Sequence, residues 1–158
     1  MAERLSTGFV NAQNVTGSVK TIMANSRIDI YSGTQPTSAD AVETGTLLMT
    51  LTINSGDFTP GSPTNGLNMG TSTDGVLSKA AAEVWSGVGK AAAGTSGTIA
   101  GWFRWRANND VAGATTTGIR LDGAIGTSST YEMQMSNTTI VQDVAAVVQT
   151  FNYTSPKA

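Results

Sequence analysis

Few residue types in this 158-residue chain could perform chemistry, because it contains no histidine and no cysteine. Their absence removes the commonest general base, the commonest metal ligand, thiol nucleophiles and disulfides. Catalysis would therefore need a pair of carboxylates, as in glycoside hydrolysis, or a serine activated by a lysine. The acidic residues lie singly along the chain, each at an ordinary place on a polar strand face or in a turn, and no nucleotide-binding, metalloprotease or serine-hydrolase motif is present. We therefore expect neither an enzyme nor a bound cofactor.

Aromatic and arginine side chains offer a second kind of chemistry, the binding of flat ligands. In the segment 98–106, Trp102 alternates with Arg104 and Arg106. A ring beside hydrogen-bonding cations can stack on sugars or bases, and Trp85 could add a further ring. A glycan-binding platform is therefore one interpretation of these residues.

The simpler interpretation of the same segment is structural. One aromatic face, in which Trp105 accompanies Ile99 and Phe103, would lie in the core. The two arginines on the other face could pair with Asp122 across neighbouring strands. Gly101, among large side chains, indicates a bulge or the close approach of another backbone.

The segment 54–76 is dense in glycine, proline, serine, threonine and asparagine. Asp57 and Asp74 could imitate a calcium loop, but the alternating oxygen ligands and closing glutamate of an EF-hand are missing. We therefore expect no metal site and interpret the segment as a surface or inter-subunit loop. Its possible anchors are Phe58, Leu67 and Met69.

Hydrophobic alternation with a period of two predicts the strands that must position these residues. Ile28 and Ile30 share one face of a strand, and turn residues with Gly33 and Pro36 follow it. The same pattern predicts strands at 27–31, 47–53, 82–87, 99–106, 119–125, 131–135, 138–141 and 146–153. Short strands at regular spacing favour an all-β fold, a single-domain β-sandwich over 27–158 with seven to eight strands, jelly-roll-like or immunoglobulin-like.

Residues 1–26 are the least strand-like part, and we interpret them as an N-terminal arm with one short helix. Ser18 can cap a helix in which Val19, Ile22 and Met23 share a face, with Asn25 as its stop. The arm could dock on a neighbouring subunit or cover an open end of the sandwich. The sequence favours neither.

Charged residues make up only 13% of the chain, and the formal net charge is −2. Such a chain has no basic field to neutralise phosphates, so we expect no nucleic-acid partner. It has no apolar run long enough to span a membrane and no apolar signal segment near its N-terminus, so we expect synthesis in the cytoplasm and no membrane association. A neutral, hydroxyl-rich surface is easily dehydrated, which suits permanent association and predicts a homo-oligomer.

The block IYSGTQPTSADAVETGTLL (30–48) resembles a motif of small structural proteins of tailed-bacteriophage virions. The resemblance extends, more weakly, to the blocks STGFVNAQ (6–13), SVKTIMA (18–24) and GTIAGWFRWRA (97–107). The resemblance implies a non-enzymatic virion component made in the host bacterial cytoplasm, with no functional residue to carry over. It favours a decoration or cement protein on the capsid surface, bound to the major capsid protein lattice as a homo-oligomer, with a trimer favoured. The alternative is a tail-associated or surface-adhesion module that recognises glycan through exposed tryptophans.

Both interpretations need contact residues on the surface. The predicted interface or ligand contacts are Tyr31, Phe58, Leu67, Met69, Trp85, Trp102, Arg104 and Arg106.

Overall fold

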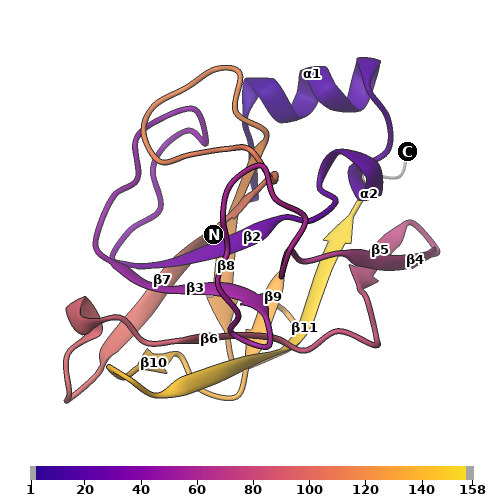
Figure 1. Cartoon of the computed structure of the whole chain (residues 1–158). Helices are drawn as coiled ribbons and strands as arrows, with labels where there is room; N and C mark the ends of the chain where they lie inside the picture. Colours follow the sequence, from indigo (N-terminus) through magenta and orange to yellow (C-terminus); the bar gives the residue numbers. More distant parts are fainter. Residues whose placement is uncertain (1–2, 156–158) are drawn as a thin grey trace.

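The computed structural model describes residues 3–155, which are mostly β-strand, so the all-β prediction is confirmed (Figure 1). Its helices are α1 (Thr7–Val15), α2 (Val19–Ile22) and the 3-10 turn η1 (Ala91–Ala93). Its strands are β1 (Arg4–Leu5), β2 (Arg27–Ser32), β3 (Leu47–Ile53), β4 (Met69–Thr73), β5 (Val76–Lys79), β6 (Trp85–Val88), β7 (Thr98–Arg106), β8 (Arg120–Gly126), β9 (Met133–Met135), β10 (Thr139–Ile140) and β11 (Ala145–Thr154). No helix between residues 3 and 155 has the length and hydropathy needed to cross a membrane.

Seven strands close into a barrel in the order β7, β2, β3, β6, β11, β9 and β8, after which β8 pairs with β7 again. The closure depends on β9, which runs antiparallel to β11 and parallel to β8. The predicted β-sandwich is therefore corrected to a closed barrel. Alternation along each strand is the same in both architectures, because it reports only that one face of the strand is buried.

Short strands extend this ring. Strand β1 pairs with β8, β10 pairs with β7, and the hairpin of β4 and β5 continues from β11. The prediction of one long loop over 54–76 is wrong in its last third, since Met69–Thr73 is strand β4. Asp74 and Gly75 both have positive φ and form the hairpin turn, which matches the strong Asp-Gly turn preference.

An aromatic cluster fills the barrel interior around Phe151. Its ring centroid lies 5.1 Å from that of Trp105, 5.4 Å from that of Trp85 and 5.5 Å from that of Phe103. Trp105 is fully buried, and its Nε1 donates to Ser26 Oγ at 2.7 Å, so the indole N–H has a partner inside the core. The prediction that Trp105 and Phe103 lie in the core is confirmed.

The predicted core position of Ile99 is wrong, because a bulge at Gly101 changes the phase of β7. Tyr31 pairs with Trp102, but the next residue of β2, Ser32, pairs with Ala100. Beyond the bulge Ala100 therefore points inward, and Ile99 is 68% exposed. A Cβ on Gly101 would lie 1.9 Å from the carbonyl oxygen of Gly33, so both the bulge and the close backbone predicted at this glycine are present.

The N-terminal helices cover one end of the chain's own barrel, as Figure 1 shows. Ser6 and Ser18 cap α1 and α2, and Asn25 adopts positive φ after the second helix. Phe9 and Met23 are fully buried in the core. The helix capped by Ser18 was predicted, whereas α1 was not.

Candidate functional site

The outer faces of β2, β7 and β8 carry polar side chains in register. Across the three strands, one row is Arg27, Arg106 and Arg120, the next is Asp29, Arg104 and Asp122, and the third is Tyr31, Trp102 and Ala124. All nine residues are at least nine-tenths buried, although they point away from the barrel interior. Two segments cover them, the β2–β3 loop (33–46) and the β7–β8 loop (107–119).

Eight charged residues meet between this face and the two loops, and we call them the ionic cluster. They are Arg27, Asp29, Glu43, Arg104, Arg106, Asp110, Arg120 and Asp122. Four positive and four negative side chains make the cluster formally neutral. Neutrality and saturation with hydrogen bonds are what allow charges to be buried at this density.

Arg104 and Asp122 form the pair that the sequence predicted. Nε and Nη2 of Arg104 donate to the two carboxylate oxygens of Asp122 at 2.6 and 2.8 Å. Nη1 of Arg104 donates to Glu43 Oε1 at 2.9 Å and to the carbonyl oxygen of Ala41 at 3.0 Å. Arg104 therefore ties the β2–β3 loop to the outside of the barrel.

Arg106 binds other partners than the predicted Asp122. Its Nε donates to Asp29 Oδ2 and its Nη1 to Asp110 Oδ2, both at 2.8 Å, and its Nη2 donates to Glu43. These carboxylates offset the repulsion expected when Arg106 faces arginines on both neighbouring strands. Arg106 thus joins both covering loops to one strand.

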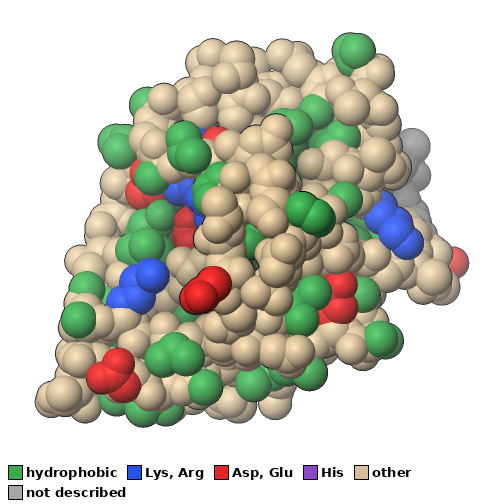
Figure 2. Space-filling view, viewed as in Figure 1, with side chains coloured by type: hydrophobic (Ala, Val, Ile, Leu, Met, Phe, Trp, Pro, Cys, Tyr) green, Lys and Arg blue, Asp and Glu red, His purple; other side chains and the backbone are tan. Residues whose placement is uncertain are grey.

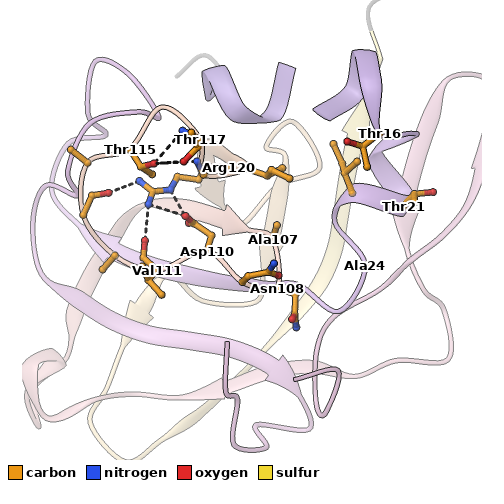
Figure 3. Close-up of a pocket in the computed structure, with 17 residues that line it drawn as sticks. Thr16, Thr21, Ala24, Ala107, Asn108, Asp110, Val111, Thr115, Thr117 and Arg120 are labelled. Carbon is orange, nitrogen blue, oxygen red and sulfur yellow. Dashed lines mark hydrogen bonds and ion pairs between the residues drawn. The ribbon is translucent and has the colours of Figure 1, made fainter. Parts of the chain in front are cut away.

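Arg120 holds the β7–β8 loop closed on itself, as Figure 3 shows. Its Nε and Nη2 donate to Asp110 at 2.7 and 2.9 Å, and its remaining donors reach the carbonyl oxygens of Val111 and Gly113, both at 2.6 Å. The amide of Gly113 donates to Glu43 Oε2 at 3.1 Å, which links this loop to the β2–β3 loop.

The electrostatics of the cluster favour the charged forms of Glu43 and Arg106, whereas burial raises the pKa of Asp122 despite its contacts with Arg104. Burial acts to raise the pKa of Glu43, but hydrogen bonds and the charge of Arg106 outweigh it and lower that pKa to about 2. Burial likewise acts to lower the pKa of Arg106, and the carboxylates of Asp29, Glu43 and Asp110 raise it above its ordinary value. Charged groups that are saturated with hydrogen bonds to one another suit the attachment of loops and not proton transfer.

Tyr31 and Trp102 continue this face beyond the charges. Their rings stack with centroids 4.6 Å apart and an interplanar angle of 14°. Both are buried, and the guanidinium carbon of Arg104 lies 5.4 Å from the centroid of the Trp102 ring. Trp102 Nε1 is buried without a hydrogen-bond partner.

A hollow of about 580 Å³ lies between the β7–β8 loop and the residues around α2 (Figure 3). Its wall is mostly threonine, alanine, asparagine and backbone. Asp110 and Arg120 reach it, but they are bound to each other, so neither is free to act as an acid or a base. Within residues 3–155, no group of three or more histidine, cysteine, aspartate or glutamate side chains is placed to hold a metal ion.

The structure places the predicted contact residues almost entirely inside the molecule. Trp85, Leu67 and Met69 belong to the barrel core. Tyr31, Trp102, Arg104 and Arg106 come together under the loops, and Phe58 alone is partly exposed, with its ring 5.2 Å from the Arg27 guanidinium. Apart from that of Phe58, their predicted role as surface contacts is corrected, because these side chains lie in the barrel core or are buried on its outer face.

Sequence reasoning missed most of the ionic cluster. Glu43 and Asp110 looked like ordinary loop carboxylates, and Arg120 had no recognised role. One signal was present: RID (27–29), RWR (104–106) and RLD (120–122) each place charges on alternate residues around a core residue. Three such strands side by side bring opposite charges onto one face.

Comparison of the chain with protein-family models, with curated proteins and with solved structures found no match.

Proposed function

We propose that this protein is a non-enzymatic structural component of a tailed-bacteriophage virion, a decoration or cement protein that stabilises the capsid through subunit contacts. The observation that carries the proposal is the distribution of charge. The ionic cluster buries four arginines and four carboxylates, in a chain that has only nine basic and eleven acidic residues. The exterior that remains is poor in charge, and Figure 2 shows isolated charged side chains on one face among neutral and apolar surface.

The two sequence blocks that resemble virion proteins form one structural unit. Block 30–48 comprises the end of β2, the covering loop and the start of β3, and block 97–107 is β7 with its flanks. They meet where Glu43 binds Arg104 and Arg106, and where Gly33 lies against Gly101. A loop held this firmly keeps its outer surface in one shape, which lowers the entropic cost of binding a lattice.

An apolar patch on β6 and β11 is a suitable contact surface. Val88 pairs with Ala145 across these strands, so the two side chains share one face with Val147. Val88, Val144 and Val147 are each between 44% and 53% exposed. We name Val88, Ala145 and Val147 the valine patch, and propose that it contacts the capsid lattice or a second copy of the chain in a homo-oligomer, for which a trimer is favoured.

The test is to omit the protein from phage particles, measure the temperature at which the genome escapes, and add the protein back at low and high salt. A protein that binds the assembled lattice better than free subunits stabilises it in proportion to occupancy. Apolar contacts survive raised salt, so rebinding is expected at both salt concentrations. Particles that are equally stable without it, together with failure to rebind, would exclude the cement role.

The valine patch is tested in the same assay with Val147→Lys. A lysine at this exposed position leaves the core intact but opposes burial in an interface, so rebinding is expected to fall at least about tenfold. Val15→Lys is the matched control, because Val15 is 87% exposed on α1, away from the patch. Equal loss in both variants would remove the patch from the proposal, and sedimentation of the free protein reports whether it is a trimer.

A further inference from the structure

Arg27 differs from the other three arginines of the ionic cluster. Arg104, Arg106 and Arg120 each donate from Nε and from both terminal nitrogens. Arg27 is 9% exposed, its Nε lies 3.5 Å from Asp29 Oδ2, and its Nη1 is buried with no hydrogen-bond partner. A buried guanidinium nitrogen without an acceptor is costly, so this donor is one that a ligand could satisfy.

The carboxylate nearest to Arg27 is already occupied. Asp29 Oδ2 accepts from Arg106 Nε and Asp29 Oδ1 accepts from Thr50 Oγ1, both at 2.8 Å. Asp29 is therefore oriented toward Arg106 and Thr50, and its contact with Arg27 Nε is the longer one of 3.5 Å. The ring centroid of Phe58 lies 5.2 Å from the Arg27 guanidinium carbon, which adds a cation–π contact.

Arg27 lines a groove of about 460 Å³ between the outer face of β3 and the loop 55–60. Lys90 lines the same groove with an exposed side chain and supplies a second cation. The hydroxyl side chains of the groove are already engaged: Thr50 donates to Asp29, Thr52 donates to the carbonyl oxygen of Gly56 at 2.7 Å, and Ser55 Oγ shares a hydrogen bond of 2.9 Å with Ser86 Oγ. Arg27 and Lys90 are thus the donors that the groove offers to a ligand.

We propose that this groove is a binding site for a small carboxylate, with Nη1 of Arg27 as the buried donor and Lys90 as the second cation. Guanidinium groups match the paired oxygens of a carboxylate. Asp57 also lines the groove and lowers its positive charge, which favours a singly charged ligand over doubly charged phosphate. The groove adjoins the valine patch at Val88, but the proposed carboxylate binding does not depend on the virion role.

The experiment is a titration of the full chain with acetate, followed by nitrogen-edited NMR and by the melting temperature, at constant ionic strength set with sodium chloride. Saturable shifts are expected in the amides of loop 55–60 and in the Arg27 side chain, with a millimolar Kd and a rise in melting temperature. Phosphate is expected to bind more weakly than acetate. Tighter phosphate binding would overturn the carboxylate assignment.

Lys90→Gln is the main variant, because Lys90 is exposed and its loss leaves the fold intact. It is expected to weaken acetate binding about tenfold, while Lys20→Gln, an exposed lysine outside the groove, leaves binding unchanged. Arg27→Met keeps the length of the side chain and is expected to abolish the shifts. Shifts that do not saturate, or that are the same in Lys90→Gln and Lys20→Gln, would overturn the site.

Discussion

Arg104 on β7 and Asp122 on β8 are direct cross-strand neighbours on the outer face of the barrel, and two hydrogen bonds of 2.6 and 2.8 Å join them. Neither side chain is exposed to solvent, and neither points into the barrel interior. The pair therefore lies between the barrel and its covering loops.

Arg104→Met leaves the Asp122 carboxylate buried without its partner and is expected to reduce the free energy of unfolding by about 3–5 kcal/mol. The double variant Arg104→Met with Asp122→Leu removes both charges and is expected to recover most of that loss. Urea denaturation measures both, with Lys20→Met as the exposed-cation control. A double variant no more stable than the single one would contradict this account of the pair.

The two buried tryptophans of β7 are expected to respond differently to replacement by phenylalanine. Trp105→Phe breaks the hydrogen bond to Ser26 and leaves space in the aromatic cluster, at a cost of about 1–3 kcal/mol. Trp102→Phe deletes an indole N–H that has no partner, so its cost is expected to be smaller. Thermal unfolding of the two variants, side by side, checks the order, and a larger loss for Trp102→Phe would refute it.

Gly101→Ala is expected to destabilise the protein by at least about 2 kcal/mol, because the added Cβ would lie 1.9 Å from the Gly33 carbonyl oxygen. The clash is with backbone and cannot be relieved by a rotamer change. Gly70→Ala is the matched control in a strand, since its nearest contact would be 3.3 Å, and it is expected to cost less than about 1 kcal/mol. Similar denaturation midpoints for the two variants would rule out the close approach.

Stability is expected to depend on pH through two glutamates with opposite signs. Glu43 has a pKa of about 2, below its ordinary 4.5, so its stabilising contribution is complete above pH 4.5 and is lost as the pH falls toward 2. Burial and then the charge of Glu132 raise the pKa of Glu3 to about 7, so folding favours its neutral form and stability is lost as the pH rises from 4.5 to 7. In a plot of melting temperature against pH, Glu3→Gln is expected to reduce the slope between pH 4.5 and 7. Glu43→Gln is expected to reduce the slope below pH 4.5. Unchanged slopes in melting temperature against pH would contradict these assignments.

Several features of the fold were predictable because they are local. Alternation in 27–31, 47–53 and 99–106 identified three strands of the barrel, since a strand with one buried face must alternate. Ser18 identified a helix start, and Gly101 a bulge with a close backbone. The partnership of Arg104 with Asp122 was also predictable, because each stands on the polar face of a strand.

For some strands the sequence could not predict which side chains point into the barrel, because bulges interrupt the alternation. Ile99 points outward because the bulge at Gly101 inserts one residue. In β11 a second irregularity between Val148 and Thr150 leaves Val148 and Phe151 buried and Val147 exposed. Such a shift depends on the neighbouring strand, so no pattern within the strand itself reports it.

The sequence by itself determined an all-β chain, poor in charge, with most of its strands in identifiable places. Tertiary structure alone decided that the strands form a ring, because closure depends on three residues of β9 bridging β8 and β11. It also decided that the loops 33–46 and 107–119 cover charged residues and are not simply solvated. Glu43 reaches Arg106 from 63 positions away, and a contact at that separation is favourable only once the strands have brought its partners together.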